Sequence, residues 1–256
     1  MSIIVKIAFH DIKYFFSSYL GTAICAVFAM ISGIVFTLFI ESYLTYTQSY
    51  SPVAPEFKLY DLNLILIQPY LNTISALLQA MIPFFTMKSL AEEQQLGTMQ
   101  LLLASPISSI QISLGKFLAI SFLVFILLLL TLPNIAILII HGSPDIWPIW
   151  GGYLGIFLVS ILLCSVGLFI SGLCNTQIAA ATSTFGVIIA LMLLQYFSPT
   201  IDNQFLKSVV EIVSISGHKD SFIRGFFSTT DISYFFTSTA IMLGFSSLSI
   251  ETMRWK

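Results

Sequence analysis

Six long stretches of this sequence contain no aspartate, glutamate, lysine or arginine, and they constrain the fold more than any other feature. Each approaches or exceeds the roughly 20 residues that a helix needs to cross the hydrocarbon core of a bilayer. None shows the alternating pattern of about ten residues that marks a strand of a membrane β-barrel. Because backbone N–H and C=O groups must be hydrogen-bonded internally in lipid, we expect six membrane-spanning α-helices. The expected spans are residues 14–40, 62–87, 117–140, 149–173, 178–197 and 232–250.

The composition is that of a membrane protein. Only 9% of the 256 residues are charged and 57% are hydrophobic, with a mean hydropathy of +0.96. Soluble domains carry roughly 25% charged residues, so the shortage excludes a soluble fold. The formal net charge is −2 and the sequence has no basic stripe, which gives no sign of a nucleic-acid partner. We therefore expect one all-α membrane domain over residues 1–256, with the lipid bilayer around it.

Two segments outside the spans have a pattern of their own. From Ile4 to Phe16 apolar residues recur at helical spacing, and Lys6, Asp11 and Lys13 lie on the other face. This pattern predicts an interfacial helix on the cytoplasmic leaflet before the first span. Residues 205–227 are too apolar for a solvated loop. There we expect one or two short amphipathic or re-entrant helices that dip into the outer leaflet.

The distribution of basic residues favours an orientation with both termini in the cytoplasm. In this orientation the basic residues of the outer side lie mostly in longer loops, where the positive-inside rule counts least. The cytoplasmic side holds Lys6, Lys13, Lys88, Lys116, Arg254 and Lys256.

The spans lack the residues that several classes of membrane machinery need. Charged residues inside spans mark proton and ion pathways, and none of the six stretches holds one, which disfavours an ion-coupled transporter. The histidines are isolated, and the sequence has neither a zinc-protease pattern nor a phosphate-binding loop for ATP. We expect no metal and no cofactor on this chain, and no enzymatic activity of its own.

The most informative segment joins the second and third expected spans, over residues 88–116. Glu92 and Glu93 can be catalytic carboxylates, a docking surface or a plain solvated face. Gly97 can end a helical turn, and Pro106 interrupts the return to the membrane. An intramembrane protease of the CAAX-processing type needs an arginine four residues after the second glutamate. Gly97 stands at that position and no span contains a histidine, so this class of enzyme is disfavoured.

The same segment closely resembles that of the ABC-2 type transporter permeases, in the branch of the gliding-motility-associated and nitrous-oxide-reductase-maturation permeases. Lys88 departs from the arginine that many of these permeases have, and Gln94-Gln95 is less charged than is common there. The resemblance covers the whole chain. The matching residues read Leu90-Ala91-Glu92-Glu93, Gly97-Thr98, Leu101-Leu102-Leu103, Ser105-Pro106 and Gly115-Lys116, then His218, Phe222, Arg224-Gly225 and Asp231-Ile232-Ser233-Tyr234-Phe235.

The resemblance implies a non-catalytic export subunit in the bacterial plasma (inner) membrane. Such a permease pairs with a second permease, identical or related, and each docks a separate cytoplasmic ABC ATPase that carries the ATP and Mg. The alternative is a membrane assembly or motility platform, in which the same ATPase drives a partner without moving a solute.

The resemblance also implies roles for particular residues. In this family the loop around Glu92 behaves as a coupling helix, which closure of the ATPase pair would move as a lever on the second and third spans. We expect coupling to the ATPase from Glu92, Glu93, Gly97 and Thr98. The loop turn and the entry to the third span are expected at Pro106, Gly115 and Lys116. An outer gate is expected to contain His218, Arg224 and Gly225.

Overall fold

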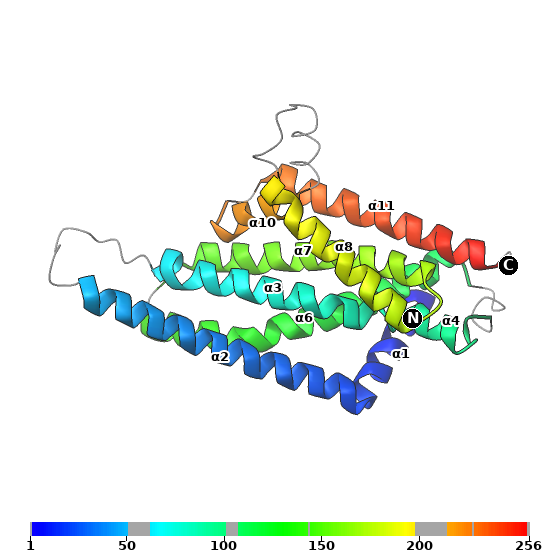
Figure 1. Cartoon of the computed structure of the whole chain (residues 1–256), viewed down its shortest axis with the longest axis horizontal. Coiled ribbons are helices and arrows are strands. Elements are labelled where there is room, and N and C mark those ends of the chain that lie inside the picture. The colour runs from blue at the N-terminus through cyan, green and yellow to red at the C-terminus, as the bar shows by residue number, and fades with distance from the viewer. Residues whose placement is uncertain are drawn as a thin grey trace.

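The computed structural model describes residues 2–50, 62–100, 107–142, 144–197, 214–226 and 228–254, and these residues form helices and no strand (Figure 1). Six helical stretches are long and apolar enough to cross a membrane, which confirms the predicted fold class. The helices are α1 (Ile3–Ser17), α2 (Tyr19–Tyr50), the π-helical turn η1 (Asn63–Ile67), α3 (Gln68–Thr86), α4 (Ala91–Gln95), α6 (Ser109–Gly142), α7 (Ile146–Leu173), α8 (Gln177–Phe197), α10 (Ile215–Ile223) and α11 (Thr229–Arg254).

The long helices run up and down along one axis, so that both termini lie at the same end of the bundle (Figure 1). We call this the terminal end; it also holds α1 and α4. The short helix α10 lies toward the far end, beside the start of α11. An even number of crossings by long helices requires this shared end, and the structure therefore agrees with two termini on one side of the membrane.

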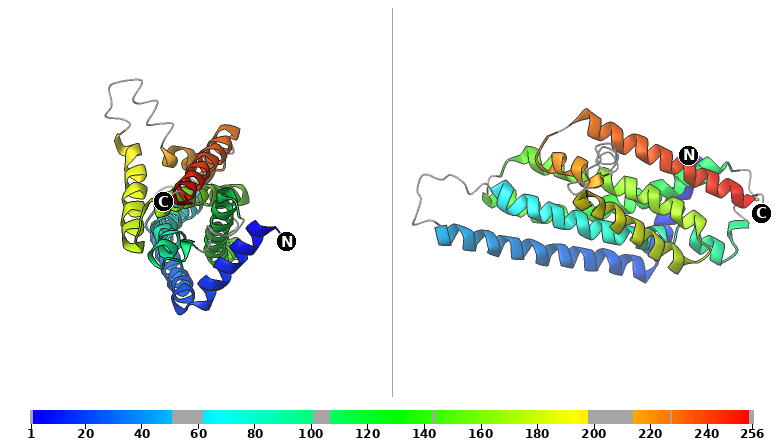
Figure 2. Two further views of the ribbon diagram at one scale, coloured as in Figure 1. Left: turned by 90° about the vertical axis from the view of Figure 1, so that its right-hand side faces the viewer. Right: turned by 45° about the horizontal axis from the view of Figure 1, so that its top comes forward.

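α7 is the centre of the bundle, and α2 and α8 are its least covered spans (Figure 2). In the apolar window of α7 72% of the residues are buried, against 17% in the windows of α2 and of α8. Glycines let neighbours approach α7 closely: a Cβ added at Gly167 would lie 2.7 Å from the Thr86 side chain of α3. Exposed apolar side chains cover the outer face of α2, which suits contact with lipid: Val27, Met30, Ile34 and Leu38.

The first span begins later than residue 14, where the sequence places it. α1 ends at Ser17, and Ser18 adopts an extended conformation with φ −85° and ψ 131°. The chain then turns sharply into α2. The turn is so tight that a Cβ at Gly21 would lie 2.1 Å from the carbonyl oxygen of Phe15. The turn contains no charge, so a search for charge-free stretches joins the end of α1 to the span. The same search stops at Glu41, although α2 continues to Tyr50.

The third span begins earlier than residue 117, where the sequence places it. α6 starts at Ser109, so Gly115 and Lys116 lie inside the helix and do not open it. The Lys116 side chain is only 3% exposed and is paired with acidic groups of the protein. Residues 117–140 themselves hold no charge, as predicted, but the helix that contains them also includes this buried lysine. Charge-free stretches identify lipid-facing residues well, but they exclude a helix position whose charge points into the protein.

Candidate functional site

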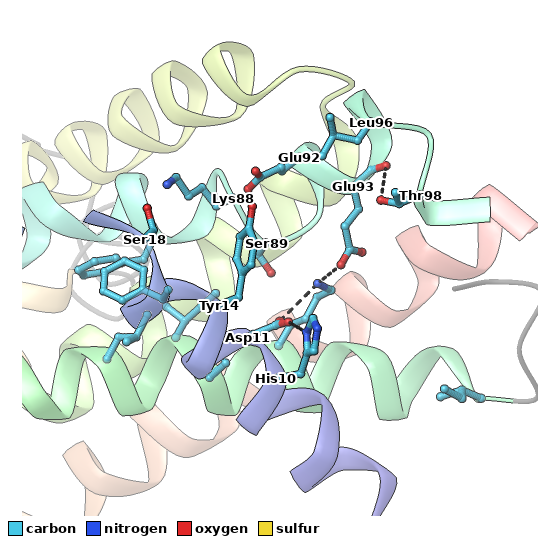
Figure 3. A pocket seen from close by; sticks show the side chains of 17 residues that line it. His10, Asp11, Tyr14, Ser18, Lys88, Ser89, Glu92, Glu93, Leu96 and Thr98 are labelled. Atoms are coloured by element: carbon cyan, nitrogen blue, oxygen red, sulfur yellow. Dashed lines mark hydrogen bonds and ion pairs between the residues drawn. The ribbon is translucent and has the colours of Figure 1, made fainter. Parts of the chain in front are cut away.

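A cavity of about 780 Å³ opens at the terminal end, between α1, the end of α3, α4 and α6 (Figure 3). Its volume lies within the roughly 300–1,000 Å³ typical of small-molecule sites. Phe15, Phe85 and Ile120 contribute to an apolar wall, whereas Asp11 and Glu93 contribute acidic groups. Acidic, basic and aromatic side chains of several helices meet at this cavity.

A buried ammonium group joins three elements at this cavity. The Lys116 Nζ of α6 donates to Glu93 Oε1 of α4 over 2.7 Å and to Asp11 Oδ2 of α1 over 3.5 Å. Figure 3 shows Asp11 and Glu93 reaching toward the same nitrogen from α1 and from α4. The Asp11 and Glu93 side chains are 29% and 26% exposed, but Glu93 Oε2 itself is buried. We call these three residues the ionic cluster.

The ionic cluster stabilises the packing of α1 and α4 on α6 because burying a charged lysine alone would cost several kcal/mol. Two carboxylates share one ammonium group, and the net charge of the cluster is therefore −1. His10 Nδ1 lies 3.4 Å from Asp11 Oδ1 at its exposed edge. Charge-assisted hydrogen bonds of this kind fix geometry as well as adding stability.

Glu92 and Glu93 have different surroundings, although they are adjacent. Both are half-buried and both line the cavity. Glu93 belongs to the ionic cluster, whereas Glu92 forms no ion pair with any described residue. The sequence predicts the same role for both residues, and the structure separates them.

α4 is also held from the side of α7. Its first backbone N–H groups have no partner within the helix, as at any helix start. The Ser171 hydroxyl oxygen of α7 accepts hydrogen bonds from the N–H groups of Leu90, over 3.2 Å, and Ala91, over 3.1 Å. Gln94 Nε2 donates to the carbonyl oxygen of Gly172 over 3.3 Å. The short helix is thus tied to α7 at one side and to α6 and α1 at the other.

Gly97 and Thr98 follow the last turn of α4. Gly97 has a φ of +72°, a left-handed conformation that glycine adopts without steric cost. Its N–H donates to the carbonyl oxygen of Gln94 over 3.2 Å, and the Thr98 hydroxyl donates to that of Glu93 over 3.4 Å. These residues therefore fix where the helix stops. Pro106, predicted to form the loop turn, lies outside the described residues.

Gly115 allows α1 to lie directly on α6. A Cβ at this position would lie 2.8 Å from the side chain of Ile7 and 3.2 Å from the carbonyl oxygen of Ile4, both in α1. Any larger residue would push the two helices apart. Gly115 and Lys116 thus act together, since one permits the close approach and the other supplies the charge beside it.

The residues predicted for an outer gate lie toward the far end, and only part of that segment is described. Residues 205–213 and 227 lie outside the described residues, and the rest forms α10 and its turn into α11. Phe222 and Ile223 of α10 are buried, so this helix packs on the bundle. Gly225, with a φ of +82°, ends the turn against Pro148 of α7. Gating by this segment stays a prediction.

His218 joins α10 to α11. Its Nδ1 lies 2.6 Å from Asp231 Oδ1, and its ring stacks on Tyr234 with centroids 4.3 Å apart. Asp231 is buried, whereas the His218 side chain is 24% exposed, so the pair is partly open to water. The neighbouring Lys219 is half-buried, and burial lowers the pKa of its ammonium group, with Asp220 opposing the shift. Arg224 is exposed at the end of α10 and takes no part in this pair.

Sequence reasoning missed two residues of the terminal-end site. Asp11 is a single acidic residue on the polar face of an amphipathic helix, where a solvated position is the usual expectation. Ser171 is one of several serines in apolar helices, and only its place at the start of α4 distinguishes it. No group of three or more metal-binding side chains occurs among the described residues.

Comparison with protein-family models identifies the family of this chain. The family model described as ABC-2 family transporter protein matches residues 5–201, which is more than half of the chain. The matched range includes most of α1, together with α4, the ionic cluster and Ser171. No curated protein matches this chain.

Proposed function

Because the chain belongs to the ABC-2 family of transporter proteins, and is therefore a multi-pass membrane component of an ABC transporter, we propose that α4 is its coupling helix. A separate ATPase chain would dock against the terminal end of the bundle and drive export. ATP and Mg²⁺ would bind to that partner and not to this chain. The terminal end would then lie in the cytoplasm, with the permease in the bacterial inner membrane.

The anchoring of α4 is the observation that carries this proposal. A helix of five residues has little stability of its own, so α4 depends on its contacts for its position. Those contacts lead to α7 through Ser171 and to α6 and α1 through Lys116. A push on α4 by a docked ATPase would thus reach both sides of the bundle without a charge crossing the membrane.

Glu92 is the residue of α4 best placed to contact the partner directly. It forms no ion pair with a described residue and can accept charge-assisted hydrogen bonds from an arginine or lysine of the ATPase. Glu93 would act differently, because its Oε1 already accepts from Lys116. We assign Glu92 to docking and Glu93 to transmission.

A second permease, identical or related, would complete the transporter. The least covered spans, α2 and α8, present apolar faces that can meet lipid or a partner subunit. The resemblance to the gliding-motility and nitrous-oxide-reductase-maturation branch supports export or the alternative of an assembly or motility platform. Both functions would use the same coupling helix.

Stimulated ATP hydrolysis tests the proposal. The permease and the ATPase that co-purifies with it are reconstituted in proteoliposomes, as wild type, as the double variant Glu92→Ala/Glu93→Ala and as Glu251→Ala. Glu251 is an exposed carboxylate at the terminal end of α11 and serves as the control. We expect the double variant to insert normally and to abolish permease-stimulated hydrolysis, while the control retains it. Full stimulation by the double variant would refute the role of α4.

A further inference from the structure

The cavity at the terminal end has an acidic excess among its described lining residues. Its charged lining consists of Asp11, Glu92 and Glu93 against Lys88 and Lys116, a net charge of −1 with His10 neutral. This excess comes from the ionic cluster, in which one ammonium group faces two carboxylates, because Glu92 and Lys88 cancel. A cation in the cavity would neutralise this excess and offset the cost of holding it beside an apolar wall.

Two acceptor atoms at this cavity have no donor among the described residues. Glu93 Oε2 is buried and meets no hydrogen-bond partner, although Oε1 of the same group is paired with Lys116. The hydroxyl of Ser89, a residue only 7% exposed, also has no partner. Both residues line the cavity (Figure 3). Buried polar atoms are nearly always hydrogen-bonded, so two such atoms beside one cavity indicate a missing donor.

The remaining lining suits a hydrocarbon chain next to a cation. Phe15 and Phe85 pack edge to face with ring centroids 5.5 Å apart, and Ile120 and Leu123 continue the wall along α6. Tyr14 lies at the same cavity, nearer the polar groups (Figure 3). Aromatic rings attract ammonium groups through their electron-rich faces.

We propose that this cavity binds an amphiphilic amine, a molecule with one ammonium group and at least one hydrocarbon chain. The ammonium group donates to Glu93 Oε2 and Ser89 Oγ and brings the cavity to neutrality. The chain lies along the aromatic and aliphatic wall. This proposal does not depend on the coupling role of α4, because its test measures binding to the cavity and not ATP hydrolysis. The amine is a lipid headgroup or a free alkylamine, which have the same recognition chemistry.

Binding of radiolabelled decylammonium, a primary alkylammonium ion with three N–H donors, to the permease in nanodiscs tests the proposal, with empty nanodiscs subtracted. Decanesulfonate has the same chain length and the opposite charge, and it is the matched ligand control. We expect saturable binding of the cation and at least about tenfold weaker binding of the anion, because the anion repels the carboxylates and satisfies neither acceptor. Equal or tighter binding of decanesulfonate would overturn the proposal.

Variants separate charge recognition from folding. Glu93→Gln removes the carboxylate with the free acceptor, and we expect about tenfold weaker binding, as for a lost hydrogen bond to a charged group. Glu92→Gln leaves the ionic cluster intact and should weaken binding about threefold, as for a partly exposed charge. Ala119→Phe fills the cavity from α6 and should abolish binding, whereas Glu251→Gln, outside the cavity, should leave it unchanged. Unchanged binding in Glu92→Gln and Glu93→Gln together would refute recognition by charge.

The lipid of the nanodisc identifies the source of the amine. Phosphatidylethanolamine carries an ammonium headgroup and phosphatidylglycerol does not. If the natural occupant is a lipid, the probe binds more weakly in phosphatidylethanolamine nanodiscs because the headgroup competes for the cavity. If the occupant is a free alkylamine, the affinity is the same in both. Either result supports an amine site, provided that decanesulfonate fails to bind.

Discussion

Replacing Lys116 with methionine would remove the ammonium group that joins α1, α4 and α6 while keeping most of the side-chain volume. The Glu93 and Asp11 oxygens lie 2.7 and 3.5 Å from the Lys116 nitrogen. Without that nitrogen the two carboxylates would face each other with no cation between them. Glu93→Gln would instead leave the buried ammonium with Asp11 alone. Each single change breaks the cluster from a different side.

The expected cost follows from the exposure of the three side chains. Breaking a fully buried ion pair from one side costs about 3–5 kcal/mol, and an exposed pair contributes roughly 0–1 kcal/mol. Lys116 is 3% exposed, but Asp11 and Glu93 are 29% and 26% exposed and can recover part of their hydration. We therefore expect each single variant to lose about 2 kcal/mol of unfolding free energy. The double variant Lys116→Met/Glu93→Gln should lose about 1–2 kcal/mol less than the sum.

The assay is unfolding of the purified protein in mixed micelles with a rising fraction of dodecyl sulfate, followed by circular dichroism. Lys13→Met is the control, because Lys13 is exposed on α1 and forms no ion pair with a described residue. The control should change the unfolding free energy by less than about 0.5 kcal/mol. If the losses of unfolding free energy in the two single variants sum to that of the double variant within about 0.3 kcal/mol, the two groups are not coupled. The ionic cluster would then not hold α4 in place.

Three further changes test other parts of the structure in the same unfolding assay. Gly115→Val should cost about 1–3 kcal/mol, because its Cβ would overlap α1, whereas Gly244→Val, with open space around it, should cost less than half as much. Asp231→Asn should cost about 1–2 kcal/mol by weakening the bond to His218, and an unchanged midpoint would contradict its role in joining α10 to α11. Burial lowers the pKa of Lys219 in the folded state, so just below the ordinary pKa of 10.5 the unfolded state binds more protons and stability rises with pH. Lys219→Met should remove this rise. A wild-type stability that does not change with pH below 10.5 would contradict the argument.

The spans could be predicted from the sequence because lipid allows so few solutions. Wherever a helix faces lipid or the apolar core, charge is excluded, and the six charge-free stretches mark six helices. Only the ends of the helices are predicted poorly. α2 continues beyond Glu41 and α6 begins before Lys116, since a charge within a helix can point to water or to another charged group.

The candidate site could be located from the sequence but not assembled. One sequence segment, whose pattern resembles that of the ABC-2 permeases, contains Glu92, Glu93, Gly97 and Lys116. Their proximity in the structure could therefore be predicted. Lys116 and Asp11 are 105 positions apart in the sequence, and Ala91 and Ser171 are 80 positions apart. No local pattern predicts such pairs, because they depend on how α1 and α7 pack in three dimensions.

Photo-crosslinking in native membranes tests most directly whether α4 receives the ATPase. A benzophenone amino acid is placed at Leu96, which is 66% exposed at the end of α4, and separately at Trp147, which is 77% exposed at the start of α7. We expect Leu96 to crosslink to the ATP-binding subunit that co-purifies with the chain, and Trp147 to give no such product because it lies at the far end. A crosslink to that subunit from Trp147 and none from Leu96 would contradict coupling through α4 and the cytoplasmic position of the terminal end.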